Sequence, residues 1–101
     1  MITEDYCSVK VTGLLEEKGF IVKYYYVQNE YRCPTHQMAM KWLRETHRID
    51  IIIEISDPSV KDRKYYCMIW DGNNNSHILD LFNSYEEAVE AAIKYCLENL
   101  I

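Results

Sequence analysis

Hydrophobic side chains recur along the chain at two spacings, which predict the helices and the strands. In "SYEEAVEAAIKYCLENL", residues 84–100, apolar residues return every three or four positions, as on one face of a helix. Ser84 and Glu87 form the S-x-x-E pattern of a capping box at its start. The expected buried face comprises Tyr85, Ala88, Val89, Ala92, Cys96 and Leu100. We therefore predict an amphipathic helix at this end.

Two further segments show the helical spacing. Residues 8–18, "SVKVTGLLEEK", have Ser8 as a candidate N-cap and Gly19 directly after the last turn. The segment "CPTHQMAMKWLRETH", residues 33–47, begins its helix with Thr35 as the cap or Pro34 at the first helical position. Its expected buried stripe comprises Met38, Ala39, Trp42, Leu43 and Thr46.

Aromatic and β-branched residues dominate four other segments, which we predict to be strands. These are residues 20–27, 50–56, 64–70 and 77–82. The loop "DGNNNS" between the last two is typical of a hairpin. The order αβαβββα predicts one α+β domain, residues 1–101, with an antiparallel sheet that carries its helices on one face. From Pro34 onward the order is that of double-stranded RNA-binding domains.

Alternation along the strands assigns apolar residues to both faces of the sheet. Ile51, Ile53 and Ile55 should face the helices, together with Tyr65, Cys67 and Ile69. Leu79 and Leu81 join them if the second loop holds an odd number of residues or a bulge. The opposite face then collects Tyr25, Ile52, Tyr66, Met68, Trp70, Ile78 and Phe82.

So much apolar area is not expected to stay in water on a monomer. Either the N-terminal helix, residues 8–18, folds across it, or a second copy or another protein binds it. A different strand register is the third interpretation. Aromatic and methionine side chains are enriched in the cores of protein interfaces. The surface is therefore a candidate partner-binding site.

The net charge of −5 and the sequence pI of about 5.1 disfavour binding through phosphates, which relies on lysine and arginine. Where double-stranded RNA-binding domains use lysines, at the start of the last helix, this chain has Tyr85, Glu86 and Glu87. Nucleic-acid binding through base stacking on the aromatic sheet face remains the alternative function.

No apolar stretch approaches the roughly 20 residues that span a bilayer, and "MITEDYCSVK" does not resemble a secretory signal. We therefore expect a cytoplasmic protein without membrane contact. In that compartment cysteines stay reduced, and we expect buried thiols. The cysteines are Cys7, Cys33, Cys67 and Cys96.

Candidate chemistry is concentrated in residues 33–47. His36 and His47 are eleven residues apart on one helix, about 16 Å, so they cannot share a metal ion. Cys33 and His36 could pair around a metal ion, but for the two further ligands the chain offers only His77 and three dispersed cysteines. For catalysis, no third group is placed to orient the histidine. No phosphate-binding glycine motif is present. We expect no catalytic site, no cofactor and no metal.

The segments "MITEDY", "CPT" followed by "AMKWLRE-x-H", and "YEEAVEAAIKYCLENLI" resemble a family of short uncharacterised proteins of Bacteroidetes-type gut bacteria and their phages or mobile elements. The resemblance covers both ends and the central helix. It implies a small α+β domain and transfers no catalytic residue. Together with the apolar face, it favours a non-catalytic module for protein interaction or self-association.

Overall fold

The computed structural model describes residues 5–21, 33–56, 61 and 63–101. The helices are α1 (Val9–Glu17), α2 (His36–His47) and α3 (Tyr85–Asn99). The strands are β1 (Asp50–Ile55), β2 (Tyr65–Trp70) and β3 (Ser76–Phe82), and they form one antiparallel sheet in the order β1-β2-β3. The predicted α+β class is confirmed. Residues 22–27 of the first predicted strand lie outside the described residues.

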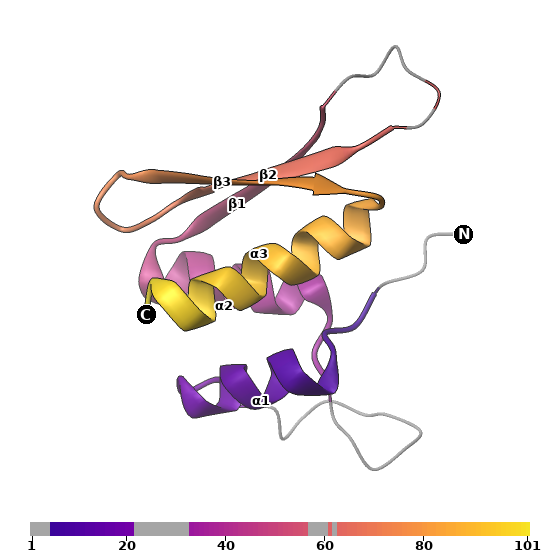
Figure 1. The fold of residues 1–101 in the computed structure, drawn as a ribbon. Helices are drawn as coiled ribbons and strands as arrows, with labels where there is room; N and C mark the ends of the chain where they lie inside the picture. Colours follow the sequence, from indigo (N-terminus) through magenta and orange to yellow (C-terminus); the bar gives the residue numbers. More distant parts are fainter. Residues whose placement is uncertain (1–4, 22–32, 57–60, 62) are drawn as a thin grey trace.

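The elements lie in three layers, with the sheet on one side, α2 and α3 beneath it, and α1 beneath them (Figure 1). Helix α3 contacts all three strands, α2 contacts β1 and α3, and α1 contacts α3. The interpretation that residues 8–18 cover the second face of the sheet is therefore wrong. The buried apolar side chains of α1, Val11 and Leu15, belong instead to the core cluster that includes α3.

The predicted caps are confirmed, because each helix begins at a hydroxyl that accepts a backbone N–H. Ser8 Oγ accepts from the amide of Val11, and Thr35 Oγ1 accepts from the amide of Met38, both at 3.1 Å. The first hydrogen bond caps α1 at Ser8. The second shows that Thr35 is the cap of α2.

At α3, Ser84 Oγ accepts from the amide of Glu87 at 3.1 Å. The Glu87 carboxylate in turn accepts from the amide of Asn83 at 3.0 Å, one residue before the cap. The cap itself is as predicted, but the return hydrogen bond of the capping box goes to the amide of Asn83 rather than to that of Ser84.

The strand register confirms one expectation and corrects two. Five residues separate Trp70 from its partner Ser76, so Leu79 pairs with Cys67 on the helix side as predicted. A bulge then pairs Phe82 with Tyr65. The extra residue, Leu81, is 64% exposed, whereas Phe82 packs against the core. The sequence predicts Leu81 on the helix side and Phe82 on the outer face. Both predictions are wrong, because a single inserted residue reverses the alternation that follows it.

The buried faces of the helices also differ from the simple stripes. In α2 the buried stripe is narrower than predicted, because Met38 and Thr46 are exposed while Ala39 and Leu43 are buried. In α3 it is wider, because Ile93 and Leu97 are buried as well. The predicted burial of Tyr85 is wrong, because this side chain in the first turn is 47% exposed. Helix α3 lies between the sheet and α1, so it needs apolar residues toward both.

Candidate functional site

The outer face of the sheet, the face turned away from the helices, carries a regular grid of nine side chains. It comprises Asp50, Ile52, Glu54, Tyr66, Met68, Trp70, Ser76, Ile78 and Asp80. Ile52, Met68 and Ile78 lie opposite one another across the three strands and form its middle row. Trp70 and Tyr66 flank Met68 along β2. Together these five residues make an apolar cross.

The corners of the grid are polar. Asp50 and Glu54 occupy the two corners on β1, and Ser76 and Asp80 occupy those on β3. Three corners therefore carry carboxylates. The three strands contain neither lysine nor arginine, so no cation within them balances these charges.

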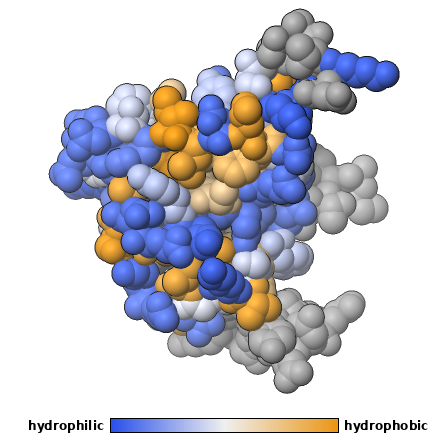
Figure 2. Space-filling model, in the orientation of Figure 1, coloured by the Kyte–Doolittle hydropathy of each residue, from blue (hydrophilic) through white to orange (hydrophobic). Residues whose placement is uncertain are grey.

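The apolar cross is accessible. Ile78 is 58% exposed, Ile52 is 41% exposed and Trp70 is 39% exposed, while Met68 and Tyr66 are half-buried. In Figure 2 hydrophobic patches alternate with hydrophilic surface in the upper part of the molecule, where the sheet lies. Large apolar side chains are thus left in contact with solvent.

Five of the seven predicted partner-binding residues come together in the apolar cross. They are Ile52, Tyr66, Met68, Trp70 and Ile78. Phe82 is on the helix side, as the bulge requires, and Tyr25 lies outside the described residues.

One hydrogen bond joins the cross to its acidic corners. The hydroxyl of Tyr66 donates to Glu54 Oε2 at 2.9 Å, directly across from β2 to β1. This hydrogen bond is the main reason why the pKa of Tyr66 is raised. The Tyr66 ring is thereby held over the outer face, with its polar end at the acidic edge.

A second group of reactive side chains lies on the other side of the sheet, among the helices. Ligand atoms of Cys7, His36 and Glu90 all lie within 4.8 Å of one another. Asp5–Cys7 pairs with the start of α2 through an antiparallel bridge between Tyr6 and Thr35. Backbone hydrogen bonds of 2.8 Å, from Cys7 to Pro34 and from His36 to Asp5, hold the segments together. Glu90 comes from the second turn of α3.

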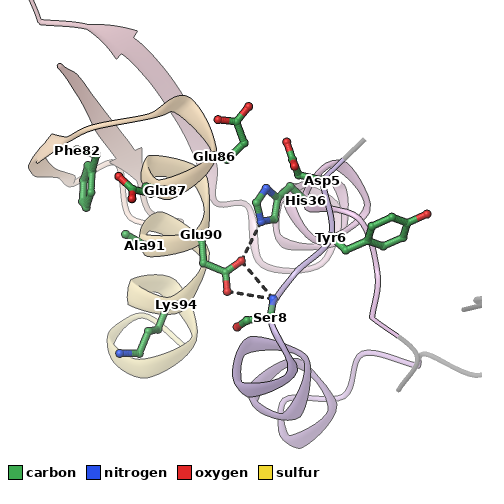
Figure 3. A pocket seen from close by; sticks show the side chains of 10 residues that line it. All are labelled: Asp5, Tyr6, Ser8, His36, Phe82, Glu86, Glu87, Glu90, Ala91 and Lys94. Atoms are coloured by element: carbon green, nitrogen blue, oxygen red, sulfur yellow. Dashed lines mark hydrogen bonds and ion pairs between the residues drawn. The ribbon is translucent and has the colours of Figure 1, made fainter. Parts of the chain in front are cut away.

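Glu90 is the centre of the hydrogen bonding in this group (Figure 3). Its Oε1 is 2.8 Å from His36 Nε2, and its Oε2 accepts from the amide of Ser8 at 3.1 Å. Burial acts to raise the pKa of Glu90, but the hydrogen bonds from His36 and Ser8 outweigh it and lower the pKa. The carboxylate therefore stays ionised in a half-buried position.

The thiol of Cys7 is poorly suited to act as a nucleophile. Burial, followed by the charges of Glu90 and Cys33, raises its pKa to about 12. A reactive cysteine requires a lowered pKa and an electropositive surrounding. Glu90 is thus the third group that could orient His36, which the sequence did not reveal. The neighbouring thiol of Cys7 is protonated, however, so the three residues do not form a catalytic set.

An open hollow of about 580 Å³ adjoins this group. His36 and Glu90 lie on its wall, with Phe82 and Ala91 on the apolar side (Figure 3). The sequence does not reveal this site because Glu90 is 54 residues from His36, and because Cys7 stands before α1, far along the chain from α2 and α3. The C-x-x-H spacing of Cys33 and His36 was the only available signal.

No family model matches the chain, and searches of curated proteins and of solved structures found no match either. Among the described residues, no helix has both the length and the apolar character needed to cross a membrane.

Proposed function

We propose that this chain is a non-catalytic protein-binding module, and that its outer face binds a protein segment with an apolar centre and basic edges. The observation that carries the proposal is the apolar cross with carboxylates at three of its corners. We place this module in the cytoplasm, which the four free thiols favour.

The apolar cross supplies the attraction. Ile52, Trp70 and Ile78 are each more than a third exposed, so covering them removes apolar surface from water. Tryptophan, tyrosine and methionine are also the residue types that interface cores favour. A partner segment with large apolar side chains fits this surface.

The acidic corners supply the specificity. Asp50, Glu54 and Asp80 have no lysine or arginine beside them within the strands. A partner with basic residues at the edges of its apolar core would meet these carboxylates, which speeds association and disfavours acidic competitors. Such binding should weaken as salt concentration rises.

The same charges disfavour a second copy as the occupant. When two such grids stack face to face about an aligned twofold axis, at least one carboxylate of one copy lies opposite a carboxylate of the other. Like charges placed together across an interface cost free energy. The carboxylates would likewise repel the phosphates of a nucleic acid, whose binding requires a positive groove.

Two synthetic peptides test the proposal. Both carry the same short apolar core, and one is flanked by lysines while the other is flanked by glutamates. We expect the lysine-flanked peptide to bind at least about tenfold more tightly, a difference of about 1.4 kcal/mol, with NMR shift changes confined to β1, β2 and β3.

Matched variants locate the binding surface. Ile78→Glu places a charge on the apolar cross, and Val9→Glu places one at the 52% exposed Val9 of α1, in the layer farthest from the sheet. We expect Ile78→Glu to abolish the peptide-induced shifts and Val9→Glu to leave them unchanged. Equal binding of the two peptides, or shifts on the helices, would contradict the proposal.

The other occupants give distinct results. A dimer in sedimentation that Ile78→Glu dissociates would assign the outer face to a second copy. Binding of a labelled RNA or DNA at low salt that Ile78→Glu removes would assign it to nucleic acid. Either result overturns the proposed partner chemistry.

A further inference from the structure

We propose that Cys7, His36 and Glu90 form a zinc-binding site that joins the N-terminal segment to α2 and α3. The three ligand atoms lie within 4.8 Å of one another, although they come from three separate parts of the chain. This site is independent of the outer face, from which the sheet and its core separate it.

The donor set selects the metal. A thiolate, an imidazole and a carboxylate are all ligands that zinc accepts. Calcium and magnesium prefer oxygen ligands alone, so Cys7 and His36 disfavour them. The combination therefore indicates zinc rather than an alkaline-earth ion.

The distances are close to those of a tetrahedral site. With zinc about 2.0 to 2.3 Å from each ligand, the ligand atoms lie roughly 3.3 to 3.6 Å apart. His36 Nε2 and Glu90 Oε1 are now 2.8 Å apart, so they would have to separate slightly. The remaining pairs are at most 4.8 Å apart, so they are within reach of one zinc ion after small movements of the side chains.

The ligands are held before any metal binds. Cys7 and His36 are both buried, and their backbones are fixed by the short antiparallel pairing of Asp5–Cys7 with Pro34–His36. The amide of Ser8 donates to Glu90 Oε2 at 3.1 Å and contacts Oε1 at 3.4 Å, which holds the carboxylate beside His36. Oε1 now contacts His36 Nε2 and would have to exchange this contact for the metal. Hydrogen bonds from neighbouring groups, such as the one from Ser8, orient the carboxylates that bind metals. Cys7 Sγ has only a weak contact, 3.9 Å from the carbonyl oxygen of Thr35.

The hollow beside the site supplies access. His36 and Glu90 line its wall, so zinc can enter from solvent and a water molecule can take the fourth position. Binding would displace the thiol proton of Cys7 to solvent, as metal binding to cysteine requires. The metal would then tie residue 7 to two helices.

Cobalt substitution is the direct test. Metal-free protein is titrated with Co²⁺, which gives visible d–d bands in a tetrahedral site and a near-ultraviolet charge-transfer band only when a thiolate is bound. We expect both bands to saturate at one equivalent and to disappear when Zn²⁺ is added. Zn²⁺ should also raise the melting temperature of the protein, because it binds the folded state.

Variants identify the ligands. We expect Cys7→Ser to abolish the charge-transfer band and His36→Gln to weaken cobalt binding by at least about tenfold, since even groups that only support a ligand contribute that much. Cys33→Ser is the matched control, because Cys33 stands shortly before α2, the helix that carries His36, and is not a member of the cluster. Circular dichroism verifies that each variant is folded.

Three results would overturn the proposal. One is the absence of a charge-transfer band at one equivalent of cobalt, which needs no variant and so holds even if Cys7→Ser does not fold. Another is loss of the band in Cys33→Ser, and the third is unchanged affinity in His36→Gln. The Ile78→Glu variant should bind zinc normally, so this result is separate from that of the peptide experiments.

Discussion

Asp71, at the start of the loop between β2 and β3, shows how one side chain fixes its surroundings. Its Oδ1 accepts from the amides of Asn73 and Asn75 at 2.8 and 3.1 Å. Its Oδ2 is 3.0 Å from His77 Nε2, and the other ring nitrogen of His77 is 3.2 Å from the hydroxyl of Tyr95. The carboxylate thereby connects the loop to α3.

Stability should depend on this carboxylate in acid. The hydrogen bond with His77 and those from the backbone amides lower the pKa of Asp71 below its unfolded value. The stabilisation is therefore complete above the unfolded pKa and is lost as the pH falls through the folded pKa. We expect Asp71→Asn to be less stable than the unmodified protein at pH 6, and the difference to shrink as the pH falls below about 4.

Urea unfolding at several pH values checks this expectation. Asp80→Asn is a suitable control, since Asp80 is an exposed carboxylate of the neighbouring strand. A stability difference for Asp71→Asn that stays constant from pH 6 to strongly acidic pH would show that its carboxylate contributes nothing through ionisation.

Among the elements, β3 depends on the bulge more than on its sequence pattern. Phe82 returns to the helix side because Leu81 is the extra residue opposite the Tyr65–Tyr66 step. We expect Phe82→Ala to reduce the free energy of unfolding by about 2 kcal/mol, since it removes a partly buried ring from the core. Leu81→Ala should change it by less than about 0.5 kcal/mol, because Leu81 is exposed.

Chemical denaturation of the two variants measures both values. A larger effect from Leu81→Ala than from Phe82→Ala would mean that Leu81, and not Phe82, is buried. That result would contradict the bulge and support an uninterrupted alternation along β3.

The elements differ in how far the sequence determines them. The starts of all three helices followed from Ser8, Thr35 and Ser84, because a cap is a local hydrogen bond. The five-residue loop also fixed Leu79 on the helix side. The bulge left no such local mark, since no glycine or proline stands near Leu81.

The sites divide in the same way. The apolar cross follows from alternation within β1 and β2, so most of it was predictable. The group around Glu90 was not, because its three members meet only when α3 packs against α2 and against the segment before α1. Contacts between distant segments depend on packing that the spacing of residues does not specify.

At the scale of the whole molecule, α3 is the central layer. Its apolar residues face both the sheet and α1, which explains why its buried face is wider than a single stripe. The spacing of apolar residues predicts the helix α1 but not which element it packs against, so the prediction that it covers the sheet was wrong.

The position of α1 makes a testable difference to stability. Leu15 is fully buried in the shared core, so we expect Leu15→Ala to lower the free energy of unfolding by about 2 to 5 kcal/mol. Val9→Ala, at an exposed position of the same helix, should change it by no more than about 0.5 kcal/mol. Denaturation curves for both variants provide the comparison, and similar small effects would mean that α1 is not part of the cooperative fold.

The absence of lysine from the three strands has a practical consequence for labelling the protein. Amine-reactive labels attach to lysine, and no lysine is present in β1, β2 or β3. Biotin or a fluorophore coupled through lysine would therefore leave the residues of the apolar cross chemically unaltered. Protein immobilised on a sensor chip in this way would keep those side chains unmodified for the incoming ligand.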